Sequence, residues 1–223
     1  MPKKDIPPFT GFPKDLPDFL WGLSFNNERP WFHAHREDFE RCLHMPILSL
    51  AEDVKARMEK LYPGQAPTLH VSRIWRDARR LFGRGPFQDH MWFSLGVSGE
   101  IYTPLPQFWF GINAKNWDAG MGMWNMKGEL LERWRKSIDA NPRRLEAVVR
   151  ELDKHPELHR YWEVYKKPKG DPGPYLYDWY NARTIGLEVT EWFEPNPPGP
   201  ELLDRVVDIF TALMPLYQYL LTI

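Results

Sequence analysis

The spacing of apolar residues changes along the chain, and this change constrains the fold more than any other feature. In three segments in the middle, residues 69–75, 91–97 and 108–112, most of the residues at every second position are apolar. Such alternation is typical of strands, because successive side chains point to opposite faces of a sheet. Turn residues separate the three segments. They therefore predict an antiparallel sheet with one face covered.

The segments on both sides of this region have helical spacing instead. Before it, helices are predicted over residues 15–25 and 30–61, with an interruption at Pro46. After it, helices are predicted over residues 129–139, 142–152 and 201–221, and a further strand over 184–193. This order predicts an α+β fold, in which N-terminal and C-terminal helices cover one antiparallel sheet.

The chain has 223 residues, a length that fits a single domain. Residues 1–14 are rich in proline and are expected to form a lightly ordered lead-in, so residues 15–223 would form the domain. Aromatic residues make up 15% of the chain, which includes 11 tryptophans. Because large apolar side chains usually serve packing, we expect an aromatic-rich core more than a ligand-stacking surface.

The charge and the single cysteine limit the partners and the compartment. The formal net charge is −1, which gives no overall field to attract nucleic acid. Cys42 has no partner for an intrachain disulfide, and it is expected to be packed in a helix and unreactive. No secretory signal and no long apolar run is present. We therefore expect a cytoplasmic protein that does not enter a membrane.

The segment from Arg73 to Arg84 contains five arginines and one aspartate. A guanidinium group offers a planar fork of donors that matches a carboxylate or a phosphate. A second basic cluster, Lys166 to Lys169, lies on a loop rich in glycine and proline and could close over the same anion. The residues predicted to bind this ligand are Arg73, Arg76, Arg79, Arg84 and Lys169.

Each of these residues also has a structural interpretation. Asp77 and Asp89 are the nearest candidates for acid–base catalysis, but a short acidic residue at a turn usually binds local backbone N–H groups, and we favour that role for Asp77. Arg73 and Arg76 could equally bind carboxylates of the protein itself. The lysine cluster could be a solvated run of charge.

Other chemistries find little support in the sequence. His33 with His35, and His155 with His159, are poor metal-ligand pairs, and no cysteine cluster completes a site. The chain has no nucleophile elbow and no Walker loop, and the glycines at 120 and 122 are too closely spaced for a phosphate cradle. The sequence therefore predicts no metal and no cofactor.

The order of motifs resembles the family of bacterial and fungal proteins known as domain of unknown function 2461 (DUF2461). The matching motifs are Asn26-Asn27 followed by Trp31-Phe32, the string Arg73–Arg79, Gly120–Trp124, and Pro168-Lys169-Gly170. The resemblance extends from Phe9 to about Leu216. At two positions where the family typically has lysine, this chain has Arg84, which keeps the charge, and Gln88, which loses it. The resemblance implies no established activity.

The sequence thus predicts a cleft lined by arginine and lysine that binds a small anionic or phosphorylated molecule. Two alternatives remain open. One is a module that interacts with nucleic acid, which the near-neutral charge disfavours. The other is a structural or interaction protein without catalytic activity, in which the arginines only connect parts of the fold.

Overall fold

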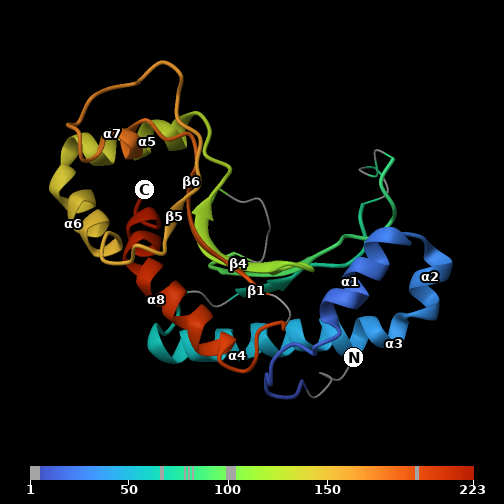
Figure 1. Cartoon of the computed structure of the whole chain (residues 1–223). Coiled ribbons are helices and arrows are strands. Elements are labelled where there is room, and N and C mark those ends of the chain that lie inside the picture. Colours follow the sequence, from blue (N-terminus) through green and yellow to red (C-terminus); the bar gives the residue numbers. More distant parts are fainter. Residues whose placement is uncertain are drawn as a thin grey trace.

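A six-stranded antiparallel sheet forms the centre of the protein, in the order β1-β2-β3-β4-β6-β5 (Figure 1). The computed structural model describes residues 6–65, 68–77, 79, 81, 83–98, 104–193 and 196–223. The strands are β1 (Thr68–Val71), β2 (Met91–Gly96), β3 (Gln107–Ile112), β4 (Asn116–Met123), β5 (His159–Arg160) and β6 (Ile185–Trp192). Each neighbouring pair is antiparallel.

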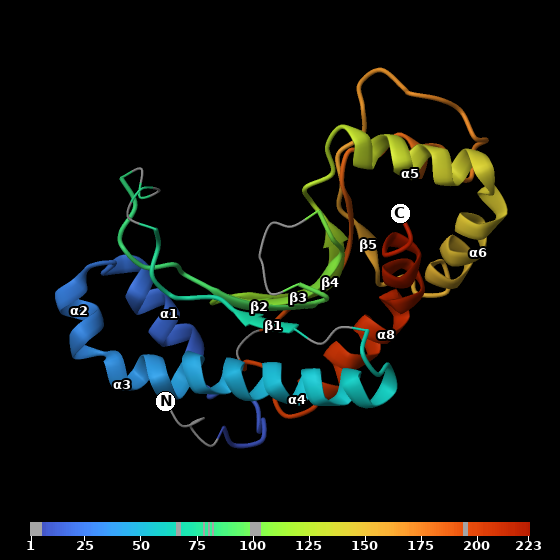
Figure 2. The ribbon, with the colours of Figure 1, turned by 180° about the vertical axis from the view of Figure 1, so that it is seen from behind.

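Helices cover one face of this sheet and extend beyond both of its ends. They are α1 (Leu16–Phe25), α2 (Arg29–Ala34), α3 (Arg36–Phe39), the π-helical turn η1 (Glu40–His44), α4 (Met45–Leu61), α5 (Glu129–Ala140), α6 (Pro142–Leu152), α7 (Tyr177–Tyr180) and α8 (Leu202–Leu220). Helices α4 and α8 lie against the same face of the sheet, and no drawn helix lies on the opposite face (Figures 1 and 2). The predicted α+β fold, with helices from both ends of the chain on one sheet, is confirmed.

The covered face is apolar because every second residue of the central strands is apolar. In one row across the sheet, Phe93 is opposite Phe110, Phe110 is opposite Ala119, and Ala119 is opposite Val189. All four are buried. Phe108 on β3 stacks against Phe210 and Tyr217 of α8, at ring-centroid distances of 4.8 and 4.6 Å. Burial of each such ring contributes about 1.5–3 kcal/mol relative to an exposed ring, so this face is the main core.

Most of the predicted helices match the observed ones within one or two residues. Pro46 lies in the first turn of α4, directly after η1, so the interruption predicted at that position is confirmed. In the described part of the lead-in, Phe9 and Phe12 are buried. The Phe9 N–H donates to Asp53 at 2.7 Å, and the Phe12 N–H donates to the carbonyl of Pro198 at 3.0 Å. These two residues therefore pack against the rest of the fold.

One prediction for the sheet was wrong, and two strands, β4 and β5, were not predicted. The strand predicted over residues 69–75 ends at Val71, and Trp75 only forms an isolated bridge with Phe87. Strand β4, in the middle of the sheet, was not predicted, because Asp118, Gly120 and Gly122 have low strand propensity. None of the described helices has the length and apolar character needed to cross a membrane.

Candidate functional site

The uncovered face of the sheet is hollowed in two places, and Trp92 lines both. The first, which we call the tryptophan hollow, has a volume of about 670 Å³. It is lined by Trp92, Ser94, Gln107, Trp109, Asn116, Asp118, Trp124, Tyr161, Glu188 and Thr190. The second, the arginine hollow, has a volume of about 620 Å³. It is lined by His70, Ser72, Arg73, Trp75, Arg76, Asp77, Arg84, Gln88, His90 and Trp92.

The arginine hollow is formed by the arm, the segment of residues 72–90 that connects β1 to β2. The arm extends beyond the sheet next to the junction of α1 and α2 (Figure 1). The Arg76 N–H donates to the carbonyl of Pro86 at 2.8 Å, and the Gln88 N–H donates to the carbonyl of Ile74 at 2.7 Å. These bonds hold the two halves of the arm side by side.

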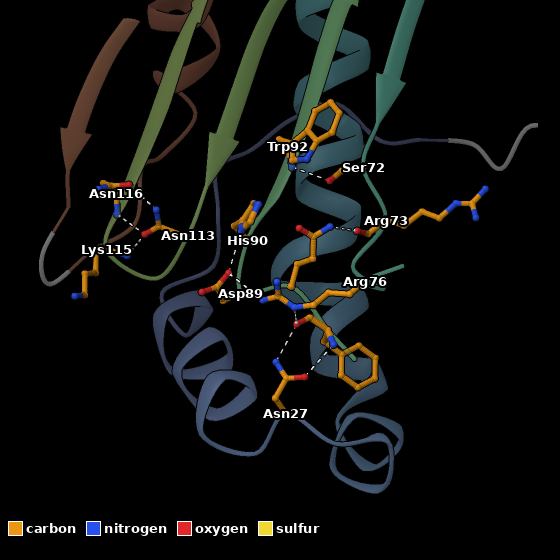
Figure 3. A network of polar contacts seen from close by, with 12 residues as sticks. Asn27, Ser72, Arg73, Arg76, Asp89, His90, Trp92, Asn113, Lys115 and Asn116 are labelled. Carbon is orange, nitrogen blue, oxygen red and sulfur yellow. Dashed lines mark hydrogen bonds and ion pairs between the residues drawn. The ribbon is translucent and has the colours of Figure 1, made fainter. Parts of the chain in front are cut away.

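Of the five residues predicted to share one cleft, Arg73, Arg76 and Arg84 line the arginine hollow. Arg76 also has an internal role, because its Nε donates to the carbonyl of Phe87 at 2.7 Å and its side chain is only 16% exposed. Arg73 is exposed, and its side chain extends away from Arg76 (Figure 3). Burial and the charge of Arg73 lower the pKa of His70, so His70 is neutral at pH 7 and the arginines supply the positive charge.

Arg79 does not join the other arginines. Its side chain is 87% exposed and forms an ion pair with Asp77 at 2.7 Å. The backbone N–H of Arg79 also donates to Asp77, at 3.0 Å. Asp77 therefore has the turn-forming role that the sequence favoured for it. Residues 78, 80 and 82 of the predicted basic segment lie outside the described residues.

Asp89, the other candidate for acid–base chemistry, belongs to a network at the base of the arm (Figure 3). One carboxylate oxygen lies 2.9 Å from Nδ1 of His90 and 3.9 Å from a guanidinium nitrogen of Arg76. Burial alone would raise the pKa of Asp89. The contacts with His90, a backbone hydrogen bond and the charge of Arg76 together outweigh burial and hold the pKa below its ordinary value. At neutral pH this group is therefore a poor proton donor.

The structure places Lys169 apart from the arginines. Lys169 lines a third hollow, of about 920 Å³, together with Lys166 and Lys167. Its Nζ lies 4.7 Å from the ring centroid of Tyr165. Buried Asn181 holds this loop in place, because its Oδ1 accepts the Lys169 N–H at 2.6 Å. This loop lies across the sheet from the arm, so Lys169 does not complete the predicted cleft (Figure 1).

Three glycines allow the aromatic rings of the tryptophan hollow to lie close to the sheet. A Cβ atom on Gly120 would lie 2.7 Å from the ring of Trp109, and one on Gly122 would lie 3.1 Å from the ring of Trp124. A Cβ on Gly186 would lie 2.6 Å from the ring of Tyr161. Because these positions have no side chain, the three rings lie close against the sheet surface.

The rings also contact one another. The centroid of Trp109 lies 4.9 Å from that of Trp124 and 5.9 Å from that of Tyr161. The indole N–H of Trp124 donates to the hydroxyl of Tyr161. These contacts hold the rings as one platform, whose exposed surface can accept a planar or apolar group.

Two carboxylates, Asp118 and Glu188, lie on neighbouring strands beside this platform. Asp118 is opposite Thr190 and Glu188 is opposite Gly120, so the two are diagonal neighbours on one face. The indole N–H of Trp109 donates to Asp118 at 2.9 Å. Burial raises the pKa of Asp118, and burial together with the charge of Asp118 raises that of Glu188.

Sequence reasoning missed this second hollow because it missed β4. The aromatic residues were predicted to serve the core, and most do, but several tryptophans lie on the open face. One signal was present. Trp117, Ala119, Met121 and Met123 alternate with polar residues and glycine, which is the pattern of a half-buried strand.

Metal and thiol chemistry have no candidate site in the part of the chain that the structure describes. No three histidine, cysteine, aspartate or glutamate residues there are grouped closely enough to hold a metal ion. Cys42 is fully buried, and burial raises the pKa of its thiol to about 12. A thiol with such a pKa is protonated at neutral pH and is a weak nucleophile.

Comparison with known proteins agrees with the motifs described above. No curated protein is significantly similar to the chain. Residues 15–219 match the family described as conserved hypothetical protein (DUF2461), and the match includes the arm, β4 and the loop that carries Lys169. The match covers nearly the whole chain, and the protein therefore belongs to the DUF2461 family.

Proposed function

We propose that this protein binds a small anionic or phosphorylated molecule in the arginine hollow. The observation that carries this proposal is the grouping of Arg73, Arg76 and Arg84 on the wall of one hollow. Asp77 is the single acidic residue among the described lining residues, and it already binds Arg79. Three arginines thus line the hollow with one aspartate, and Asp89 lies 3.9 Å from Arg76. This local predominance of positive charge would attract an anion.

The three arginines would contribute differently. Arg76 is held by the carbonyl of Phe87, so it offers a fixed donor at the floor of the hollow. Arg73 is exposed and extended, and a change of rotamer would bring its guanidinium toward a bound anion. Trp92, at the boundary between the two hollows, offers an apolar surface to the rest of the molecule.

The alternative of a nucleic-acid module is less well supported by the same face. Exposed Trp75 and half-buried Trp92 could stack on bases. A nucleic-acid backbone that crosses the open face would also pass Asp118 and Glu188, whose charges would repel its phosphates. We therefore favour a small anion bound at one end of the face.

Isothermal titration calorimetry with inorganic phosphate, pyrophosphate and citrate at low ionic strength tests the proposal. We expect Arg84→Gln and Arg73→Gln each to weaken binding by about tenfold, since a charge-assisted hydrogen bond is worth roughly 1.5–3 kcal/mol. The matched control is Arg143→Gln, which removes the same charge from an exposed position on α6. Arg76→Ala is unsuitable because it would also disturb the arm.

Two results would contradict the proposal. One is that none of the three anions binds. The other is that Arg143→Gln weakens binding as much as Arg84→Gln, which would indicate a general effect of net charge. Tight binding of an oligonucleotide, with an affinity that falls steeply as salt rises, would favour the nucleic-acid alternative.

A further inference from the structure

We propose that the tryptophan hollow is a separate site for an organic cation, such as a quaternary ammonium group. This site goes beyond the anion site proposed above and does not depend on it. It rests on three observations, which are the aromatic platform, the two carboxylates beside it, and the lack of a basic residue in the described lining.

The aromatic platform provides the first part of such a site. Trp109, Trp124 and Tyr161 are in mutual contact and form one wall, and Trp92 lines the same hollow. The face of an aromatic ring is electron-rich and attracts a cation, and tryptophan does so best. Several rings around one hollow form an arrangement that proteins use to hold quaternary ammonium groups.

The charge balance of the hollow provides the second part. Asp118 and Glu188 line it, and no lysine or arginine does so among its described lining residues. Asp118 accepts a hydrogen bond from Trp109, whereas no described residue donates one to the carboxylate of Glu188. A partly buried carboxylate without a counter-charge is unfavourable, so an entering cation would gain both attraction and charge compensation.

The titratable neighbours of the carboxylates compensate their negative charge only in part. Glu188 is opposite His159 on β5 and near Asp118 on β4, and the charge of His159 only partly offsets the effect of burial. His90 acts in the same way on Asp118. The remaining neighbour, Tyr161, has a pKa above its ordinary value because its side chain is partly buried, so it is uncharged at neutral pH. A cation would thus bind more tightly as the two carboxylates lose their protons.

A neutral sugar ring is the main competing occupant, because sugars also stack on tryptophan and bond to carboxylates. The charge distinguishes the two. A neutral ring would leave both carboxylates without compensation, whereas a cation would offset part of their negative charge. The observations therefore favour the cation, and neutral sugars become one arm of the experiment.

The experiment measures binding of choline and of 3,3-dimethylbutanol, in which carbon replaces the charged nitrogen at nearly the same shape. Quenching of tryptophan fluorescence and calorimetry report binding. At about pH 7.5 we expect choline to bind at least about tenfold more tightly than the neutral isostere. At about pH 4.5 we expect the choline affinity to fall, because protonation removes the negative charge.

Variants show whether this hollow is responsible. Glu188→Gln and Asp118→Asn should each weaken choline binding by about tenfold, while phosphate binding at the arginine hollow persists. The matched control, Glu132→Gln, removes the same charge from an exposed position on α5 and should leave choline affinity unchanged. Thermal unfolding of each variant confirms that it is folded.

Three outcomes would overturn the proposal. The isostere could bind as tightly as choline, which would leave only apolar burial. Glu132→Gln could weaken choline binding as much as Glu188→Gln does. A neutral saccharide such as cellobiose could bind in the hollow while choline does not. If the protein binds choline but does not bind phosphate, the result would count against the anion site and would leave the cation site supported.

Discussion

Asn27 binds both backbone groups of Phe87, a residue 60 positions further along the chain. Its Nδ2 donates to the carbonyl of Phe87, and its Oδ1 accepts the Phe87 N–H, each at 2.9 Å (Figure 3). Gly85 leaves room for this contact, because a Cβ there would lie 2.2 Å from Oδ1 of Asn27. The carbonyl of Phe87 also accepts a hydrogen bond from Nε of Arg76. Phe87 therefore connects the arm to the α1–α2 junction.

We expect Asn27→Ala to lower the free energy of unfolding by about 2–4 kcal/mol, because it leaves a buried donor and a buried acceptor with fewer partners. Chemical denaturation measures this change. Asn26→Ala is the control, since Nδ2 of Asn26 donates only to Gly22 on an exposed surface, and its effect should stay below about 1 kcal/mol. Equal effects of the two substitutions would show that the arm does not depend on Asn27.

The second prediction concerns Gly120, one of the three glycines beneath the rings of the tryptophan hollow. In Gly120→Ala, the new Cβ would lie 2.3 Å from the carbonyl oxygen of Leu187 and 2.7 Å from Trp109. Because one of these atoms belongs to the backbone, strands β4 and β6 must shift, and we expect a loss of about 1–3 kcal/mol. Near-ultraviolet circular dichroism should change as well, because Trp109 moves.

Gly96→Ala, at the end of β2, is the control for this prediction. The tightest contact of its Cβ would be with the flexible side chain of Gln107, at 3.2 Å, and the carbonyl oxygen of Pro106 would lie at 3.5 Å, an ordinary van der Waals distance. We expect a smaller loss of stability and an unchanged tryptophan spectrum. A Gly120→Ala protein with the wild-type spectrum would contradict the role given to Gly120.

Periodicity was enough to predict most of the fold. Each helical run before and after the sheet has one apolar stripe that must pack against the core. The predicted helix ends therefore lie close to the observed ones. Strands β2, β3 and β6 were predicted because their buried residues are large and alternate. Strand β4 was missed because glycine occupies two of its outward positions, where the rings of Trp109 and Trp124 leave no room for a side chain.

The candidate site was only partly predictable, for a different reason. The arginines of the arm are close in sequence, and local hairpin geometry brings Arg73, Arg76 and Arg84 to one hollow. Lys169 is far from them in sequence, and its distance from them depends on the path of the whole sheet. The carboxylates Asp118 and Glu188 come from separate strands that pair only in the folded protein. No local pattern links them.

The buried thiol makes a third prediction. Burial raises the pKa of Cys42 to about 12, so we expect no reaction with a thiol reagent such as DTNB in the native protein and rapid reaction after unfolding. The control is Ser24→Cys, because Ser24 is exposed on α1 and the thiol introduced there should react in the native state. Equal rates for the two thiols in the folded protein would show that α1 and η1 separate readily.

The carboxylate of Asp118 makes a prediction about stability and pH. Its pKa is raised in the folded state, chiefly by burial, so the folded protein binds this proton more tightly than the unfolded chain does. The stabilisation from this group is therefore complete below the unfolded pKa of about 3.9 and is lost as pH rises through the folded pKa. Asp118→Asn cannot ionise, and its amide oxygen can still accept the N–H of Trp109.

We therefore expect Asp118→Asn to unfold at a higher temperature than the wild type at about pH 7, with the difference shrinking toward about pH 3. Thermal unfolding across this pH range measures it. The control is Asp208→Asn, at an exposed position on α8, which should show no such pH dependence. A stabilisation that is the same at every pH would mean that packing, and not the desolvated charge, is responsible. The expected pattern would mean that the protein retains an acidic group at this position at a cost in stability, as binding sites commonly do.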